Sequence, residues 1–199
     1  MRAIGDVILV IDAGLTASDV GHVLGGALAL ANYAEPRGPV DVDVNVGVPY
    51  ESRTTLLAQL DTIGWHADDQ AVRAVPDAGT RLRHDGETVV IGLVFALDYD
   101  HEDVLDRAVA KPFIHAGERL ALQFLSAEDL TVFTISVVRP KDGVGIVAMI
   151  GAGTTIDPHH VERAPVRFGD PRPTRQRPGS GCCFEGSLGD SEHVLRRTG

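Results

Sequence analysis

Hydrophobic and polar residues alternate most regularly in the segment VDVDVNVGV, residues 40–48. The alternation places valines on one face and Asp41, Asp43 and Asn45 on the other, which predicts a strand with one buried face. Such a strand belongs to an antiparallel or mixed sheet. Side chains on one strand face lie about 6–7 Å apart, too far to share one ion without ligands from another strand. The three polar residues therefore indicate a solvated face.

Other apolar runs predict further strands. The run DVILVIDAG, residues 6–14, is typical of a buried strand that closes with Asp12. The segment 80–97 predicts a hairpin whose turn is Asp85-Gly86, and its second strand, 88–97, is apolar on both faces and so central. Three more strands are expected from the runs at 119–125, 130–138 and 144–153.

Helical spacing of apolar residues predicts helices at about 15–35, 50–64 and 101–110. Two βα units are thus followed by a mostly antiparallel section. The sequence predicts an α+β fold: a mixed, mostly antiparallel sheet of about seven strands, with two to three helices packed on one side. A ferredoxin-like start is one form that this order could take.

The composition of the chain changes near its C-terminal end. Residues 1–162 have the periodicity of a single globular domain, whereas residues 163–199 are rich in Pro, Gly and Arg and predict a tail or arm. No charge-free apolar run reaches the ~18–20 residues of a membrane span, and a basic segment leading into a signal-type apolar core is lacking. We therefore expect a cytoplasmic protein with no membrane partner.

Charge is divided unevenly between these two parts. Of the 18 Lys and Arg and 28 Asp and Glu, residues 162–199 hold 7 and 5, which leaves 11 and 23, or −12, for residues 1–161. A body with this charge repels phosphate backbones, which argues against nucleic acid as a partner. The basic arm could lie on the acidic body of another copy, so we expect a protein partner or a homo-oligomer.

The adjacent Cys182 and Cys183 indicate no disulfide framework and have no assigned role.

The stretch FALDYDHEDV, residues 95–104, holds the densest cluster of ionisable side chains. Asp100 stands where a helix N-cap is expected, and acidic residues in a first helical turn stabilise a helix. This explanation needs no ion. Alternatively Asp98 and Asp100, with Asp12 from the first strand, could hold Mg²⁺ or Mn²⁺ through their carboxylate oxygens.

Two further patterns have structural explanations. The pattern Asp-x-Gly-x-Thr at Asp12 superficially resembles the first phosphate motif of the actin and sugar-kinase fold, but here Thr16 opens a helix, so we do not expect a nucleotide there. The segment DPHHVE, residues 157–162, could offer three metal ligands only with awkward geometry and is interpreted as a turn. A Gly-x-Ser-x-Gly nucleophile motif is not present in the sequence.

Two classes of function follow. The first is a non-enzymatic protein-interaction or self-assembly module with no cofactor, in which the basic arm contacts a neighbour. The alternative is a divalent-metal-dependent hydrolase or phosphoryl-transfer enzyme with Asp12, Asp98 and Asp100 at the sheet edge. The first is favoured because each candidate site has a sufficient structural explanation.

Overall fold

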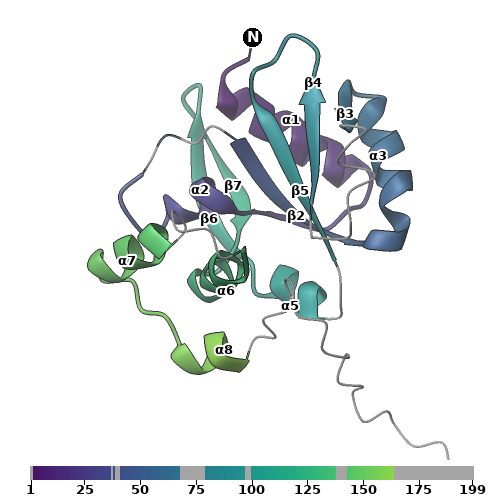
Figure 1. Cartoon of the computed structure of the whole chain (residues 1–199). Helices are drawn as coiled ribbons and strands as arrows, with labels where there is room; N and C mark the ends of the chain where they lie inside the picture. Colours follow the sequence, from purple (N-terminus) through teal and green to yellow (C-terminus); the bar gives the residue numbers. More distant parts are fainter. Residues whose placement is uncertain are drawn as a thin grey trace, which may run out of the picture.

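The computed structural model of the chain describes residues 2–36, 38, 41–67, 79–96, 100–137 and 143–163. The structure contains a seven-stranded mixed sheet with helices around it (Figure 1), which confirms the predicted α+β class. The strand order is β3-β4-β5-β2-β1-β7-β6. The strands are β1 (His22–Leu24), β2 (Asp41–Pro49), β3 (Trp65–Ala67), β4 (Thr80–His84), β5 (Val90–Ala96), β6 (Val109–His115) and β7 (Glu118–Phe124).

The helices outnumber the two to three that the sequence predicts. They are α1 (Ile4–Ala17), α2 (Gly26–Leu30), α3 (Arg53–Asp61), α5 (Asp100–Asp106), α6 (Ala127–Val137), α7 (Gly143–Gly151) and α8 (Pro158–Arg163), with a 3₁₀ turn at Tyr50–Ser52. No helix within the described residues is long and apolar enough to cross a membrane. The predicted arm at 163–199 lies outside the described residues, except for Arg163.

The regular alternation of residues 40–48 predicts a strand in a mixed sheet, and the structure has that strand as β2, at the centre of the sheet. Val42, Val44 and Val46 are fully buried. The strand pairs parallel with β5 on one side and antiparallel with β1 on the other. The hairpin of β4 and β5 and the strand β7 also match the prediction, and most neighbouring strands are antiparallel.

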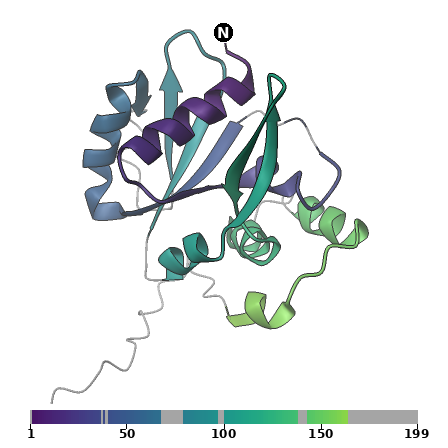
Figure 2. The ribbon, with the colours of Figure 1, turned by 180° about the vertical axis from the view of Figure 1, so that it is seen from behind.

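Helix α1 replaces the predicted first strand, and it crosses the whole sheet on one face (Figure 2). Near its start, Gly5 lies against the His115 ring of edge strand β6, and near its end Gly14 lies against Ile63 beyond α3. Asp6 and His115 form a 2.7 Å hydrogen bond, which lowers the pKa of the exposed Asp6 carboxyl. The chain thus begins with a helix, and a ferredoxin-like start was wrong.

Helices also replace the last two predicted strands. Residues 127–137 and 143–151 form α6 and α7, which lie with α2 on the side of the sheet opposite α1 (Figures 1 and 2). Likewise the predicted helix at 15–35 is broken by β1: residues 15–17 belong to the end of α1, and beyond β1 only the five residues of α2 are helical. The helices therefore cover both faces of the sheet, not one, because α1 takes one face and α2 and α6 the other.

Candidate active site

The polar row of β2 lies on the sheet face opposite α1. Asp41 is exposed, Asp43 is half-buried, and Asn45 is 3% exposed. The valines between these residues point the other way, into the core, so the alternation of the strand sets which side chains reach this face. The expectation of a solvated face was therefore wrong for Asn45 and holds only toward the start of the strand.

Glycines from two other segments surround the Asp43 carboxylate. A Cβ built on Gly26, which follows β1, would lie 1.9 Å from Oδ2 of Asp43, and one built on Gly92 of β5 would lie 2.9 Å from Oδ1. Gly26 has a φ of 53°, in the left-handed region that glycine adopts most readily. Strand pairing sets the position of Gly92 because it is the partner of Asp43 in the β2–β5 register. Backbone therefore approaches this carboxylate from both sides.

The turn between β1 and α2 is fixed to β2 by its backbone. The amide N–H of Gly25 donates a 2.8 Å hydrogen bond to the carbonyl oxygen of Asp43. A Cβ on Gly25 would lie 2.9 Å from Nδ2 of Asn45 and 3.3 Å from the side chain of Leu125. The two consecutive glycines thus lie over two residues of the polar row, Gly25 over Asn45 and Gly26 over Asp43.

Asn45 contributes a buried polar atom to this region. Its Oδ1 is inaccessible and has no hydrogen-bond partner among the described residues. A buried acceptor left without a donor costs about 1–3 kcal/mol of stability, so such atoms are uncommon and concentrate where a ligand or water completes them.

The sequence-predicted ion site of Asp12, Asp98 and Asp100 stays a prediction. Asp12 lies on helix α1, not at a strand end, and contacts Nε2 of His22 at 2.9 Å. Asp100 is the first residue of α5, whereas Asp98 and the side chain of Asp100 lie outside the described part of the structure. Helix α5 meets β2 where Leu105 approaches Gly47, at the opposite end of the strand from Asp41. Any site there is separate from the polar row.

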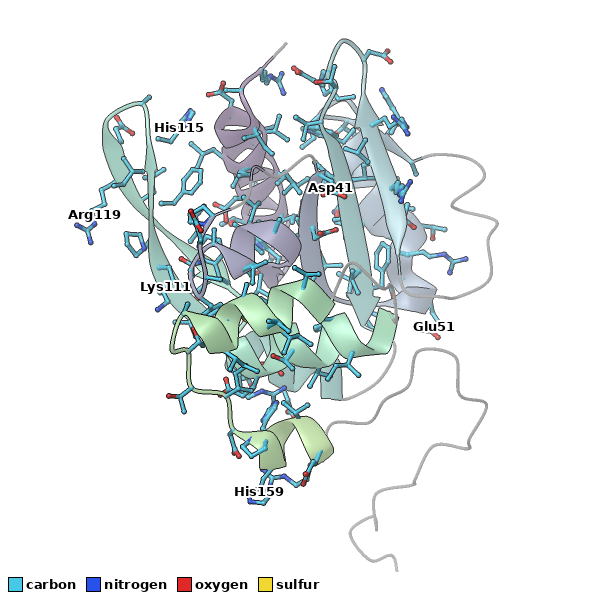
Figure 3. The ribbon with its side chains drawn as sticks, turned by 60° about the vertical axis from the view of Figure 1, so that its left-hand side comes forward. Asp41, Glu51, Lys111, His115, Arg119 and His159 are labelled. Atoms are coloured by element: carbon cyan, nitrogen blue, oxygen red, sulfur yellow. The ribbon has the colours of Figure 1, made fainter. Side chains whose placement is uncertain are left out.

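The histidine segment near the C-terminal end of the described chain is also separate. Residues 158–163 form helix α8 instead of a turn, and Oδ1 of Asp157 accepts a 2.9 Å hydrogen bond from the amide of His159 at its start. His159 lies far from Asp41 in Figure 3, and His160 faces Asp129 at 3.2 Å. Among the described residues, no group of three His, Cys, Asp or Glu could hold a metal ion.

No protein-family model matches the sequence, and no curated protein matches it. Solved structures do share its fold. The solution structure of the antibiotic-resistance factor ANT(2'')-Ia has a TM-score of 0.54 at 19% identity, over 79% of this chain and 86% of that one. The crystal structure of ANT(2'')-Ia in complex with adenylyl-2''-tobramycin has a TM-score of 0.53 at 16% identity, over 81% of this chain and 94% of that one.

This likeness shows that the chain shares the fold of ANT(2'')-Ia. The favoured expectation, a non-enzymatic interaction or self-assembly module, was wrong, and so was its emphasis on oligomeric assembly. The likeness fits the alternative, a divalent-metal-dependent hydrolase or phosphoryl-transfer enzyme, better than it fits the favoured expectation. The mistake has a physical origin: the acidic row was judged from one strand, whereas the glycines that enclose it come from two other segments.

Proposed function

We propose that this protein is a divalent-metal-dependent nucleotidyltransferase whose metal- and nucleotide-binding residues include Asp41 and Asp43. The observation that carries the proposal is the pair of carboxylates on one face of β2, beside the Gly25–Gly26 turn. The fold is shared with ANT(2'')-Ia, which was solved in complex with adenylyl-2''-tobramycin. The cytoplasm is the compartment that we propose for it.

The residues of this region fit a divalent cation. Asp41 and Asp43 offer hard oxygen ligands, which Mg²⁺ and Mn²⁺ prefer, and the orphaned Oδ1 of Asn45 lies next in the same row. Protein sites for Mg²⁺ commonly use one or two carboxylates and take their remaining ligands from substrate phosphates and water. Phosphate oxygens and waters would then supply the ligands that we expected from another strand, so two carboxylates on one strand are a sufficient donor set, although no three acidic or histidine side chains gather among the described residues.

The glycines around Asp43 are consistent with a bound nucleotide. The missing side chains at Gly26 and Gly92 let backbone come close to the Asp43 carboxylate, in the space that a Cβ would fill. Close approach of backbone to a phosphate chain is a common use of glycine. These residues would orient the α-phosphate and exclude water from it, which is most of what a phosphoryl-transfer enzyme does.

The proposed reaction transfers a nucleoside monophosphate. A hydroxyl oxygen of the acceptor forms a bond to the α-phosphorus, the bond from that phosphorus to the bridging oxygen of pyrophosphate breaks, and the hydroxyl proton is released to water. A divalent cation, when bound, supplies charge neutralisation at the phosphate oxygens. By analogy with the adenylylated tobramycin in the neighbour, we propose ATP as donor and a small hydroxylated molecule as acceptor.

The test is release of pyrophosphate from ATP and Mg²⁺ in the presence of tobramycin and other amino sugars. Wild-type protein should release pyrophosphate, and Asp43→Asn should lower the rate by at least a hundredfold, the scale of losing one preorganised charge at a transition state. Asp98→Asn is the matched comparison because it removes a carboxylate from the other candidate site. Loss of activity in Asp98→Asn with full activity in Asp43→Asn would move the proposed metal site to Asp12, Asp98 and Asp100.

A further inference from the structure

Asn45 occupies a position that packing alone would give to an apolar residue. In the strand registers its partners are Val23 of β1 and Val94 of β5. Leu125 lies on the other side of Gly25 from β2, within contact distance of that glycine's missing Cβ. The side chain is 3% exposed, and its oxygen has no partner among the described residues. A valine at this position would leave no polar atom buried, so stability gives no reason for the amide.

The amide lies next to the proposed metal-binding carboxylate. Asn45 follows Asp43 by two residues on the same strand, so the two side chains share a face. The two side chains also contact consecutive residues of one turn, because Nδ2 of Asn45 approaches Gly25 and Oδ2 of Asp43 approaches Gly26.

Strand β5 offers no oxygen ligand on this face within the paired segment. The partners of Asp41, Asp43 and Asn45 are Val90, Gly92 and Val94. A third side-chain oxygen near Asp43 can therefore come from β2 itself. An amide oxygen is a hard ligand that Mg²⁺ and Mn²⁺ accept beside carboxylates.

We propose that Asn45 is the third side-chain oxygen donor for the divalent cation at Asp43, either directly or through a water of that cation. The proposal rests on the proposed function and adds to it a residue of the metal site. It accounts for a buried polar atom that packing does not explain. It also means that Asn45 lowers the stability of the free protein and raises its affinity for the ion.

The test is a Mn²⁺ titration of the full chain, followed by the electron paramagnetic resonance of free Mn²⁺, with thermal unfolding measured on the same variants. Asn45→Val should weaken Mn²⁺ binding about tenfold, as loss of an outer-shell oxygen does at other metal sites, and should raise Tm because no polar atom stays buried. Asn45→Asp keeps the shape and an oxygen and should bind Mn²⁺ at least as tightly as wild type. Asp106→Asn, an exposed carboxylate on α5, is the control.

Each other outcome has a stated meaning. If Asp43→Asn loses Mn²⁺ while Asn45→Val binds it like wild type, Asn45 is not a ligand and the proposed function stands. A lower Tm with unchanged affinity in Asn45→Val would make Asn45 a packing residue. If Asn45→Val does not fold, Asn45→Asp decides, since weaker binding than wild type would overturn the proposal. Failure of wild-type protein to bind Mn²⁺, alone or with ATP, would overturn both the inference and the proposed function.

Discussion

At the scale of the residue, the position of the Asp43 carboxylate depends on two neighbouring glycines that have no side chain. Gly26 and Gly92 come from different segments, and each has a missing Cβ that would lie within 3 Å of a carboxylate oxygen. Real Cβ atoms do not approach oxygen so closely, so either glycine can be replaced only if the carboxylate moves. The position of the proposed metal ligand is therefore set by two glycines as much as by the strand that bears it.

A pair of glycine substitutions separates this contact from backbone strain. Gly26→Ala should lower the free energy of unfolding by about 1–2 kcal/mol because alanine is strained at positive φ, and it should also abolish Mn²⁺ binding by displacing Asp43. Gly86→Ala has the same backbone penalty, since its φ is 80°, but nothing lies within 4 Å of its Cβ. Equal Mn²⁺ affinity in the two variants, measured by titration, would show that the Cβ contact does not matter.

A second residue-scale prediction concerns pH. The pKa of the His66 imidazole is raised above 6.5 by its hydrogen bond with Asp61. A raised pKa in the folded state means that the interaction contributes its full stability below pH 6.5 and loses it as pH rises through the higher folded value. Asp61→Asn should therefore lower Tm at about pH 5.5 and change it little at about pH 8.5. Both side chains are largely exposed, so the change in Tm will be small. A Tm difference that does not vary with pH would contradict this assignment.

At the scale of the element, Asp129 joins three segments of the C-terminal half. It is 2% exposed and accepts two hydrogen bonds from Arg107, one from the Ser126 hydroxyl, and a contact from His160 on α8. The Ser126 hydroxyl oxygen in turn accepts a hydrogen bond from the amide N–H of Asp129, which caps the start of α6. One carboxylate thus holds the start of α6 to α8 and to the segment that precedes β6.

Removing this carboxylate should destabilise the fold. Asp129→Ala removes the carboxylate that accepts hydrogen bonds from Arg107 and from the Ser126 hydroxyl, so the free energy of unfolding should fall by about 2 kcal/mol. Urea denaturation measures this change in the free energy of unfolding. Asp106→Ala, an exposed acidic residue on α5, should change stability by less than about 0.5 kcal/mol. A similar small change in Asp129→Ala would mean that solvent replaces the lost contacts.

Helices and strands whose hydrophobic residues recur with a clear period could be predicted from the sequence, and those without such a period could not. The alternation in residues 40–48 predicted β2, because a period of two residues is typical of a strand. The Asp85-Gly86 turn predicted the hairpin that contains β5, because a glycine at positive φ is typical of a tight turn between two strands. The apolar runs at 6–14, 130–138 and 144–153 have no such period, and their β-branched residues favoured strands over the helices that form. Ser126 and Asp129 lie between two runs that were predicted as strands, 119–125 and 130–138, and they mark the start of a helix.

The candidate site was less predictable than the sheet. Asp41, Asp43 and Asn45 could be assigned to one strand face from sequence, but their surroundings are long-range. Gly25 lies against Asn45, and Leu125, which lies against Gly25, is 100 residues away in sequence. Gly92 meets Asp43 only through a parallel pairing. A local pattern contains no information about such contacts, which is why the row appeared to be a plain solvated surface.

At the scale of the whole molecule, the net charge favours the proposed chemistry. Residues 1–161 carry 23 acidic against 11 Lys and Arg residues, a field that attracts divalent cations. Raising NaCl from about 50 to 500 mM should therefore weaken Mn²⁺ binding several-fold because salt screens that field. If the Mn²⁺ affinity does not change with NaCl concentration, the ion is held by its local ligands alone and the overall charge does not contribute. Whether copies associate through the basic arm stays a prediction.

Strand β1 has a consequence for how this chain is made. It is three residues long and lies between β2 and β7, and its parallel pairing with β7 joins Leu24 to Phe124. During synthesis the first hundred or so residues therefore emerge with a bare sheet edge at β1, which only the late arrival of β7 can close. Such distant pairings slow folding and leave edges open to other chains. The nascent polypeptide should consequently be most prone to aggregation on the ribosome before residue 124 leaves the exit tunnel.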